Sequence, residues 1–190
     1  ADQEHNIWLG TDYGISLSRY NSALQFIPIS QITGTGDGNQ FYSLFRDSKG
    51  FYWFGGTNGL IRFTDPAGDK HNAIWYRMGD KTYPLSHNRI RHIYEDKEQQ
   101  LWIATDGSIN RYDYATRQFV HYNIVDSTGT YNTNWTYYMF EDNAGHLWIS
   151  TCLGGIFVVD KHRLMQSASG QYVAEQNYSV HNGLSGMFIN

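Results

Sequence analysis

The side chains best suited to chemistry in this sequence are those that could bind a sugar. An aromatic ring can stack on the C–H face of a sugar, while amide, carboxylate or guanidinium groups can hydrogen-bond its hydroxyls. Tyr131, Asn134 and Trp135 combine both kinds of group in one short stretch, and Arg89 adds a guanidinium. The predicted ligand-binding residues are Tyr13, Asn58, Arg89, Asp106, Tyr131, Asn134 and Trp135.

Several of these residues also have a purely structural interpretation. Asn134 recurs in register with Asn39 and Asn88, and an asparagine that recurs in this way favours a role in capping turns. Arg89 could be a solvated loop charge. Tyr131 and Trp135 have no counterpart elsewhere in the chain, so they are the most specific indication of a ligand site.

The sequence contains no recognisable catalytic or metal-binding constellation. Its eight histidines include no His-Glu-x-x-His, and no Gly-x-Ser-x-Gly elbow occurs. Glu95-Asp96 and Glu141-Asp142 could suggest glycosidase carboxylates, but they recur at predicted turns. Arg91 and His92 are the only strand residues that could serve an enzyme. We expect no catalytic residues, no metal and no cofactor.

Composition narrows the class of protein. The 190 residues are 41% apolar and 16% aromatic, with 19 glycines and 3 prolines, which favours a tightly turned, sheet-rich chain over a helical bundle. A net charge of −4 gives no electrostatic footprint for nucleic acid. No apolar run approaches the ~20 residues of a membrane span, so we expect no direct membrane contact. The single cysteine excludes an internal disulfide.

A repeat of about 45 residues organises the whole chain. Tryptophans stand at 8, 53, 102 and 148, and six residues before each of them is an aspartate, at 2, 47, 96 and 142. A small residue follows two positions after each tryptophan: Gly10, Gly55, Ala104 and Ser150. The spacing predicts that the tryptophans pack between neighbouring units and that each aspartate starts a tight hairpin turn.

Each unit predicts four short antiparallel strands, the pattern of one β-propeller blade. The fourth strands are expected at 24–29, 73–77, 119–123 and 172–178. One short helical turn is expected at 161–167. The predicted fold is therefore all-β, with about four blade-equivalents spanning 1–190 as part of a larger ring.

The units resemble the two-component regulator propeller repeats. Leu101-Trp102-Ile103-Ala104-Thr105-Asp106, followed by Ile109-Asn110-Arg111-Tyr112-Asp113, matches their pattern best. The segment 147–159 departs from it, because Cys152-Leu153 replaces the usual polar pair and no Arg-Tyr follows. The resemblance covers nearly the whole chain and is specific for the fold, but is weak evidence about a ligand.

The resemblance implies the periplasmic sensor region of a bacterial hybrid two-component system that detects carbohydrate fragments and relays binding to a histidine kinase. It implies that the expected partners are an oligosaccharide and the remaining blades of a longer protein, or a second copy that completes the ring. Two other functions stay open: a structural or protein-interaction segment, and a propeller lyase or hydrolase.

Overall fold

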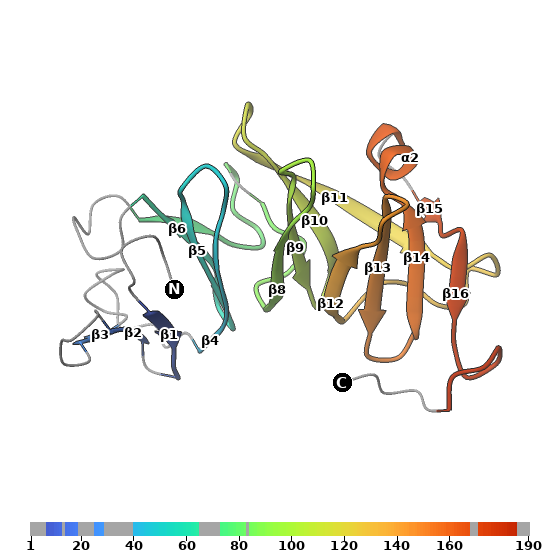
Figure 1. Ribbon diagram of the computed structural model, residues 1–190, viewed down its shortest axis with the longest axis horizontal. Helices are drawn as coiled ribbons and strands as arrows, with labels where there is room; N and C mark the ends of the chain where they lie inside the picture. The colour runs from blue at the N-terminus through green and yellow to red at the C-terminus, as the bar shows by residue number, and fades with distance from the viewer. Residues whose placement is uncertain are drawn as a thin grey trace.

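The computed structural model describes residues 7–12, 14–18, 25–28, 40–64, 73–82, 84–167 and 171–185. It confirms the all-β prediction: four sheets follow one another along the length of the molecule (Figure 1). We call them blades 1 to 4 in chain order. Within each blade, strands that follow one another in the chain pair antiparallel, as expected for a propeller.

The strand bounds follow the repeat. Blade 1 contains β1 (Ile7–Gly10), β2 (Gly14–Ser18) and β3 (Gln25–Pro28). Blade 2 contains β4 (Phe41–Arg46), β5 (Tyr52–Gly56), β6 (Gly59–Phe63) and β7 (Ile74–Tyr76). Blade 3 contains β8 (Ile90–Glu95), β9 (Leu101–Thr105), β10 (Ser108–Asp113) and β11 (Gln118–Val125). Blade 4 contains β12 (Thr136–Glu141), β13 (His146–Thr151), β14 (Ile156–Asp160) and β16 (Gln176–Tyr178).

The last fourth strand differs from the prediction. The stretch expected as one strand at 172–178 is two strands, and only β16 joins blade 4. β15 (Gln171–Val173) instead pairs in parallel with β11 of blade 3. The helix α2 (Lys161–Gln166), predicted as a helical turn, begins directly after β14, with Asp160 as its N-cap. Because α2 leads the chain away from β14, the chain first pairs with blade 3 through β15 and only then returns to blade 4 as β16.

One carboxylate organises each hairpin turn. The Oδ1 atoms of Asp47, Asp96 and Asp142 each accept backbone N–H bonds from residues two and four positions later. Their Oδ2 atoms accept from the indole Nε1 of Trp53, Trp102 and Trp148 at 2.7, 2.9 and 2.8 Å. The predicted turns are therefore confirmed, and the aspartate also fixes the tryptophan of its own blade.

The left-handed position of these turns is filled as expected in two blades. Gly50 and Gly145 have φ of 87° and 84°. Gln99 takes the same place in blade 3 with φ of 61°, a conformation that costs a non-glycine residue free energy. The turn of blade 3 therefore depends more strongly on the side-chain bonds of Asp96.

Blades 3 and 4 each also bond to the turn of the blade before them. Glu95 of blade 3 accepts from the backbone N–H of Ser48 at 2.9 Å, and Glu141 of blade 4 accepts from that of Lys97 at 2.9 Å. These two glutamates are the acidic residues that directly precede the turn aspartates. In each acidic pair, the glutamate therefore bonds to the turn of the preceding blade, while the aspartate bonds within its own blade.

Apolar side chains fill the space between successive blades, where Trp53 and Trp102 are completely buried. The ring of Trp53 meets the edge of Tyr112 from the next blade, with centroids 5.0 Å apart. A Cβ at Gly55 would lie 2.4 Å from Ile90 of the next blade. The recurrent small residue is thus needed because the next inner strand approaches closely.

A buried lysine links blade 4 to blade 3. The Lys161 side chain is 0% exposed, and its Nζ lies 2.9 Å from Glu141 Oε1 and 3.2 Å from Asp96 Oδ2. Burial opposes the charge, but the hydrogen bonds and proximity of Glu141 and Asp96 together raise the pKa of the lysine. The ammonium is therefore held charged between the two carboxylates.

Replacing this lysine should destabilise the chain strongly. Lys161→Met leaves two carboxylates without their buried counter-charge, so we expect the free energy of unfolding to fall by about 3 kcal/mol. Lys97→Met is the matched control: Lys97 is exposed and its loss should cost below about 1 kcal/mol. Urea denaturation of both variants measures the difference, and equal losses would contradict the role given to Lys161.

The inner strands meet through His92. Its Nδ1 accepts from the backbone N–H of Met139 at 3.4 Å, and its ring stacks on Tyr138 with centroids 4.1 Å apart. Burial lowers the pKa of His92 from 6.5 to about 4. The imidazole is therefore neutral in the folded chain at neutral pH.

This pKa predicts a loss of stability in mild acid. The unfolded histidine binds its proton below pH 6.5 and the folded one only near pH 4, so stability is complete above 6.5 and falls toward 4. The loss should reach at most about 3 kcal/mol. His92→Gln keeps an acceptor for Met139 without titrating, and should flatten the pH dependence of the urea midpoint in this window. An unchanged slope would refute the assignment.

Candidate functional site

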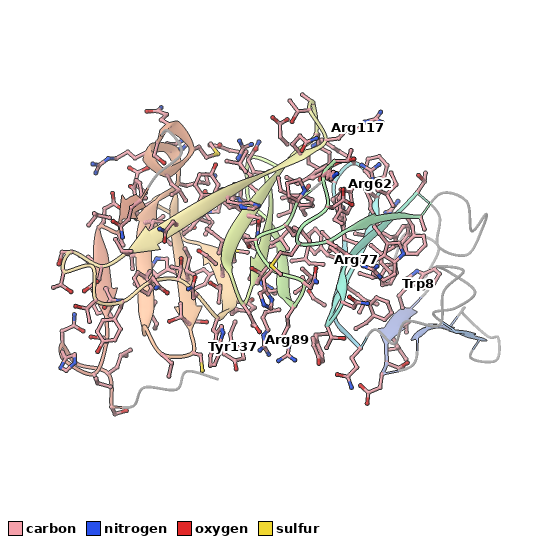
Figure 2. All side chains as sticks on the ribbon, turned by 180° about the vertical axis from the view of Figure 1, so that it is seen from behind. Trp8, Arg62, Arg77, Arg89, Arg117 and Tyr137 are labelled. Carbon is pink, nitrogen blue, oxygen red and sulfur yellow. The ribbon has the colours of Figure 1, made fainter. Side chains whose placement is uncertain are left out.

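The candidate site lies at the end of the blades where the inner strands begin. The inner strands β4, β8 and β12 each contain a β-bulge, which re-aims one side chain. The three bulged residues are Tyr42, Arg91 and Tyr137. Figure 2 shows Tyr137 and Arg89 at this end of the molecule, with Arg117 at the opposite end.

Arg91 is held in place by a carboxylate from its own blade. Its Nε donates to Asp106 Oδ1 at 2.7 Å and its Nη2 to Asp106 Oδ2 at 3.3 Å. The guanidinium lies over the ring of Tyr137, 4.8 Å from the centroid. Arg89 lies 3.7 Å from the same carboxylate, with 44% of its side chain exposed. Asp106 therefore positions two guanidinium groups, of which Arg89 is the more accessible to a ligand.

Trp135 is held in an unfavourable backbone conformation. Its φ is 56°, which is rare for a bulky residue and costs about 1 kcal/mol or more. The backbone N–H of Trp135 donates to the Asp106 carbonyl at 3.0 Å, and its carbonyl accepts from the Cys152 N–H at 3.0 Å. The residue is 49% exposed. The backbone is thus fixed by both neighbouring loops while much of the indole faces outward.

A cavity of about 420 Å³ adjoins Trp135. Its walls include Tyr131, Asn134, Trp135 and the exposed Leu153. A second cavity, of about 720 Å³, also has Tyr131 in its wall, and its other lining residues include Asp126, Thr128, Glu175, Asn177, Tyr178 and His181. The Tyr131 hydroxyl lies 3.0 Å from His181 Nε2. Tyr131 therefore borders both cavities.

The structure gathers five of the seven predicted site residues at one end of the molecule. Asp106 bonds to Trp135 through the backbone and lies beside Arg89, while Tyr131, Asn134 and Trp135 line one cavity. Asn58 belongs to blade 2 and accepts from Arg77 through its carbonyl. Tyr13 lies outside the described residues.

Sequence reasoning did not include three members of this region among the candidate site residues: Arg91, Tyr137 and Leu153. Arg91 and Tyr137 occupy the same position of successive repeats, three residues after Asn88 and Asn134, so the repeat register contains the signal. What the register does not show is the bulge that re-aims them. Leu153 was noted only as a departure from the repeat.

The recurrent asparagines differ from one another. Asn88 Oδ1 accepts from the Met78 N–H at 2.7 Å, which agrees with the capping interpretation. Asn134 is exposed and borders the cavity. Asn39 lies outside the described residues.

The described residues can be searched for a metal centre and for free acidic pairs. Among them, no group of three or more His, Cys, Asp or Glu side chains is placed to hold a metal ion. The acidic pairs that could have suggested a glycosidase are committed to turns and blade contacts. No helix in the described part of the chain is long and apolar enough to cross a membrane.

Comparisons with known proteins agree with the repeat and the fold. Residues 35–58 and 84–107 match the family model described as two component regulator propeller. No curated protein matches the chain.

Two solved structures are very similar to the chain. Both are of the extracellular domain of BT4673 from B. thetaiotaomicron, described provisionally as a one component system in one and as a hybrid two component system in the other. They are 92% and 94% identical over 100% of this chain, with TM-scores of 0.84 and 0.85. This chain spans 25% and 26% of their length.

A third structure, the extracellular domain of BT3049 from the same organism, is 20% identical over 100% of this chain and shares the fold with a TM-score of 0.72. This chain spans 23% of its length. Because the chain carries two component regulator propeller repeats and spans only a quarter of solved structures that are nearly identical to it in sequence, it forms part of a larger, extracellular β-propeller built from such repeats.

Proposed function

We propose that this chain is a ligand-sensing segment of a two-component signalling protein, and that it binds an oligosaccharide at the cavity beside Trp135. The observation that carries the proposal is Trp135 itself. It alone among the described inner-strand starts combines a left-handed backbone with an exposed aromatic face beside a cavity. A residue held in strain at an exposed position favours function over packing.

The neighbouring groups suit a sugar. Asn134 offers an amide, Arg89 an accessible guanidinium, and Tyr131 a second aromatic ring. The cavity volume of about 420 Å³ falls in the range of ligand sites. The larger cavity beyond Tyr131 gives room for further sugar units along the same surface. This arrangement supports an oligomer rather than a single sugar.

Binding here would couple to the relative position of two blades. The Trp135 backbone bonds to Asp106 of the preceding blade, so a ligand that contacts both Trp135 and Arg89 spans the joint between blades 3 and 4. A ligand that prefers one arrangement of that joint shifts the population toward it. The kinase of the parent protein would respond to that shift.

Variants of Trp135 test the proposal. Trp135→Gly removes the ring but suits φ of 56°, so the melting temperature should stay unchanged or rise while sugar affinity falls at least tenfold (~1.4 kcal/mol). Trp135→Phe keeps an aromatic face and should weaken binding by less. The measurement is calorimetric titration of the complete extracellular domain with defined oligosaccharides from glucans, xylans, mannans, pectins and glycosaminoglycans.

Trp75→Ala is the matched control, because Trp75 is a half-buried tryptophan on β7 of blade 2 and does not line the cavity. It should leave affinity unchanged. A large loss of stability in Trp135→Gly with unchanged binding would overturn the proposal and favour a structural segment. Absence of heat with every sugar would do the same.

A further inference from the structure

The joints between blades 2 and 3 and between blades 3 and 4 share one chemistry. Each turn aspartate receives a donor from the next blade, in addition to its own turn and tryptophan. At the first joint the Tyr114 hydroxyl donates to Asp47 Oδ2 at 2.7 Å. At the second joint Lys161 Nζ lies 3.2 Å from Asp96 Oδ2. In the third strand of each blade, one residue pairs with the tryptophan of the second strand: Arg111 in blade 3 and Val158 in blade 4. Tyr114 and Lys161 each lie three residues after that position, so they are equivalent.

Two further contacts recur at both joints. A glutamate of the following blade accepts the N–H of the residue after the turn aspartate, Ser48 or Lys97. A bulky third-strand residue of the following blade packs in the cluster of the tryptophan, Tyr112 with Trp53 and Val159 with Trp102. Both tryptophans are fully buried as a result.

Blade 4 presents the same three receiving groups on its outer face. They are Asp142, the N–H of Asn143 and the ring of Trp148. The Asp142 side chain is 27% exposed, against 0% for Asp96. Trp148 is half-buried between Phe140 and Tyr178, whose rings stack on it at 6.1 and 6.0 Å and are themselves exposed. This face continues the established series of joints.

We propose that this face receives a further propeller repeat of the same protein, and that this repeat carries three defined groups. The first group is an acidic side chain directly before the turn aspartate of that repeat, and this side chain accepts from the Asn143 N–H. The second is a bulky apolar residue in its third strand, which covers Trp148. The third is a hydroxyl or amino donor two residues after the apolar residue, which bonds to Asp142. The two very similar structures are about four times as long as this chain, which leaves room for such a repeat.

A second copy of this chain fits the face less well. The strand pairing Trp8↔Leu17 places Ser18 where Tyr112 stands in blade 3. In the sequence, Ala1 stands at the position of Glu95 and Glu141, directly before Asp2, the aspartate that precedes Trp8 by six residues. The first blade of a second copy would therefore offer neither the bulky apolar residue nor the carboxylate that the face receives.

Hydrogen exchange read by mass spectrometry at single-residue resolution tests this inference without any variant. In both the 190-residue chain and the complete extracellular domain, the amides of Ser48 and Lys97 should be protected, because each donates to a glutamate. The Asn143 amide should exchange about tenfold or more slowly in the complete domain than in the 190-residue chain. Ser48 and Lys97 serve as internal controls.

Two results would overturn the inference. Equal exchange of Asn143 in the two proteins would show that no carboxylate reaches it. Protection that grows with concentration in the 190-residue chain alone would identify a second copy as the occupant. Neither result depends on a sugar, so this test is separate from that of the ligand site.

Discussion

The structure depends on one buried carboxylate at the joint between blades 2 and 3 and on another at the joint between blades 3 and 4. Asp47 and Asp96 each close their own hairpin turn, fix the indole of their own blade and receive a donor from the blade that follows. Hydrogen bonds to a charged group contribute about 1.5–3 kcal/mol each, so the four donors around each carboxylate form a strong local centre. In Asp142 the bond from Trp148, with those from backbone N–H groups, outweighs burial and lowers the pKa of the carboxyl.

This carboxylate also explains why the packing between blades is so regular. Once Trp53 and Trp102 are fixed at the joint, the next inner strand can approach only where a small residue stands two positions later, as the contact between Gly55 and Ile90 shows. The inner strands then meet through side chains such as His92. At the far end of the same joint, the backbone of Trp135 bonds to that of Asp106. The geometry of the candidate site is therefore set by the joint between blades 3 and 4.

Much of the fold could be predicted from the sequence because the repeat is read in register. The spacing of the tryptophans and aspartates predicts the turns, the blade packing and the small residues that the structure contains. The split of 172–178 into β15 and β16 could not be predicted, since it depends on where α2 directs the chain. The sequence also did not show that Tyr114 and Lys161 are equivalent, because a tyrosine and a lysine resemble each other only in that each can donate a hydrogen bond.

The candidate-site residues that depart from the repeat could be picked out from the sequence, whereas the residues that follow the repeat could not. Trp135 and Tyr131 were found because nothing matches them in other units. Arg91 and Tyr137 were not included among the candidate site residues, since a bulge in the inner strand, rather than residue type, re-aims them. Asp106 was expected to contact ligand, and the structure adds that its two oxygens accept hydrogen bonds from Arg91 and lie near Arg89.

The central claim is that the turn carboxylate joins neighbouring blades, and a double-mutant cycle between Asp47 and Tyr114 tests it most directly. Asp47→Asn and Tyr114→Phe, singly and together, are compared by urea denaturation. The account predicts a coupling free energy of about 1–2 kcal/mol, because the hydroxyl donates to a charged acceptor. Losses that add within about 0.5 kcal/mol would contradict it, since the two blades would then be held together independently of this bond.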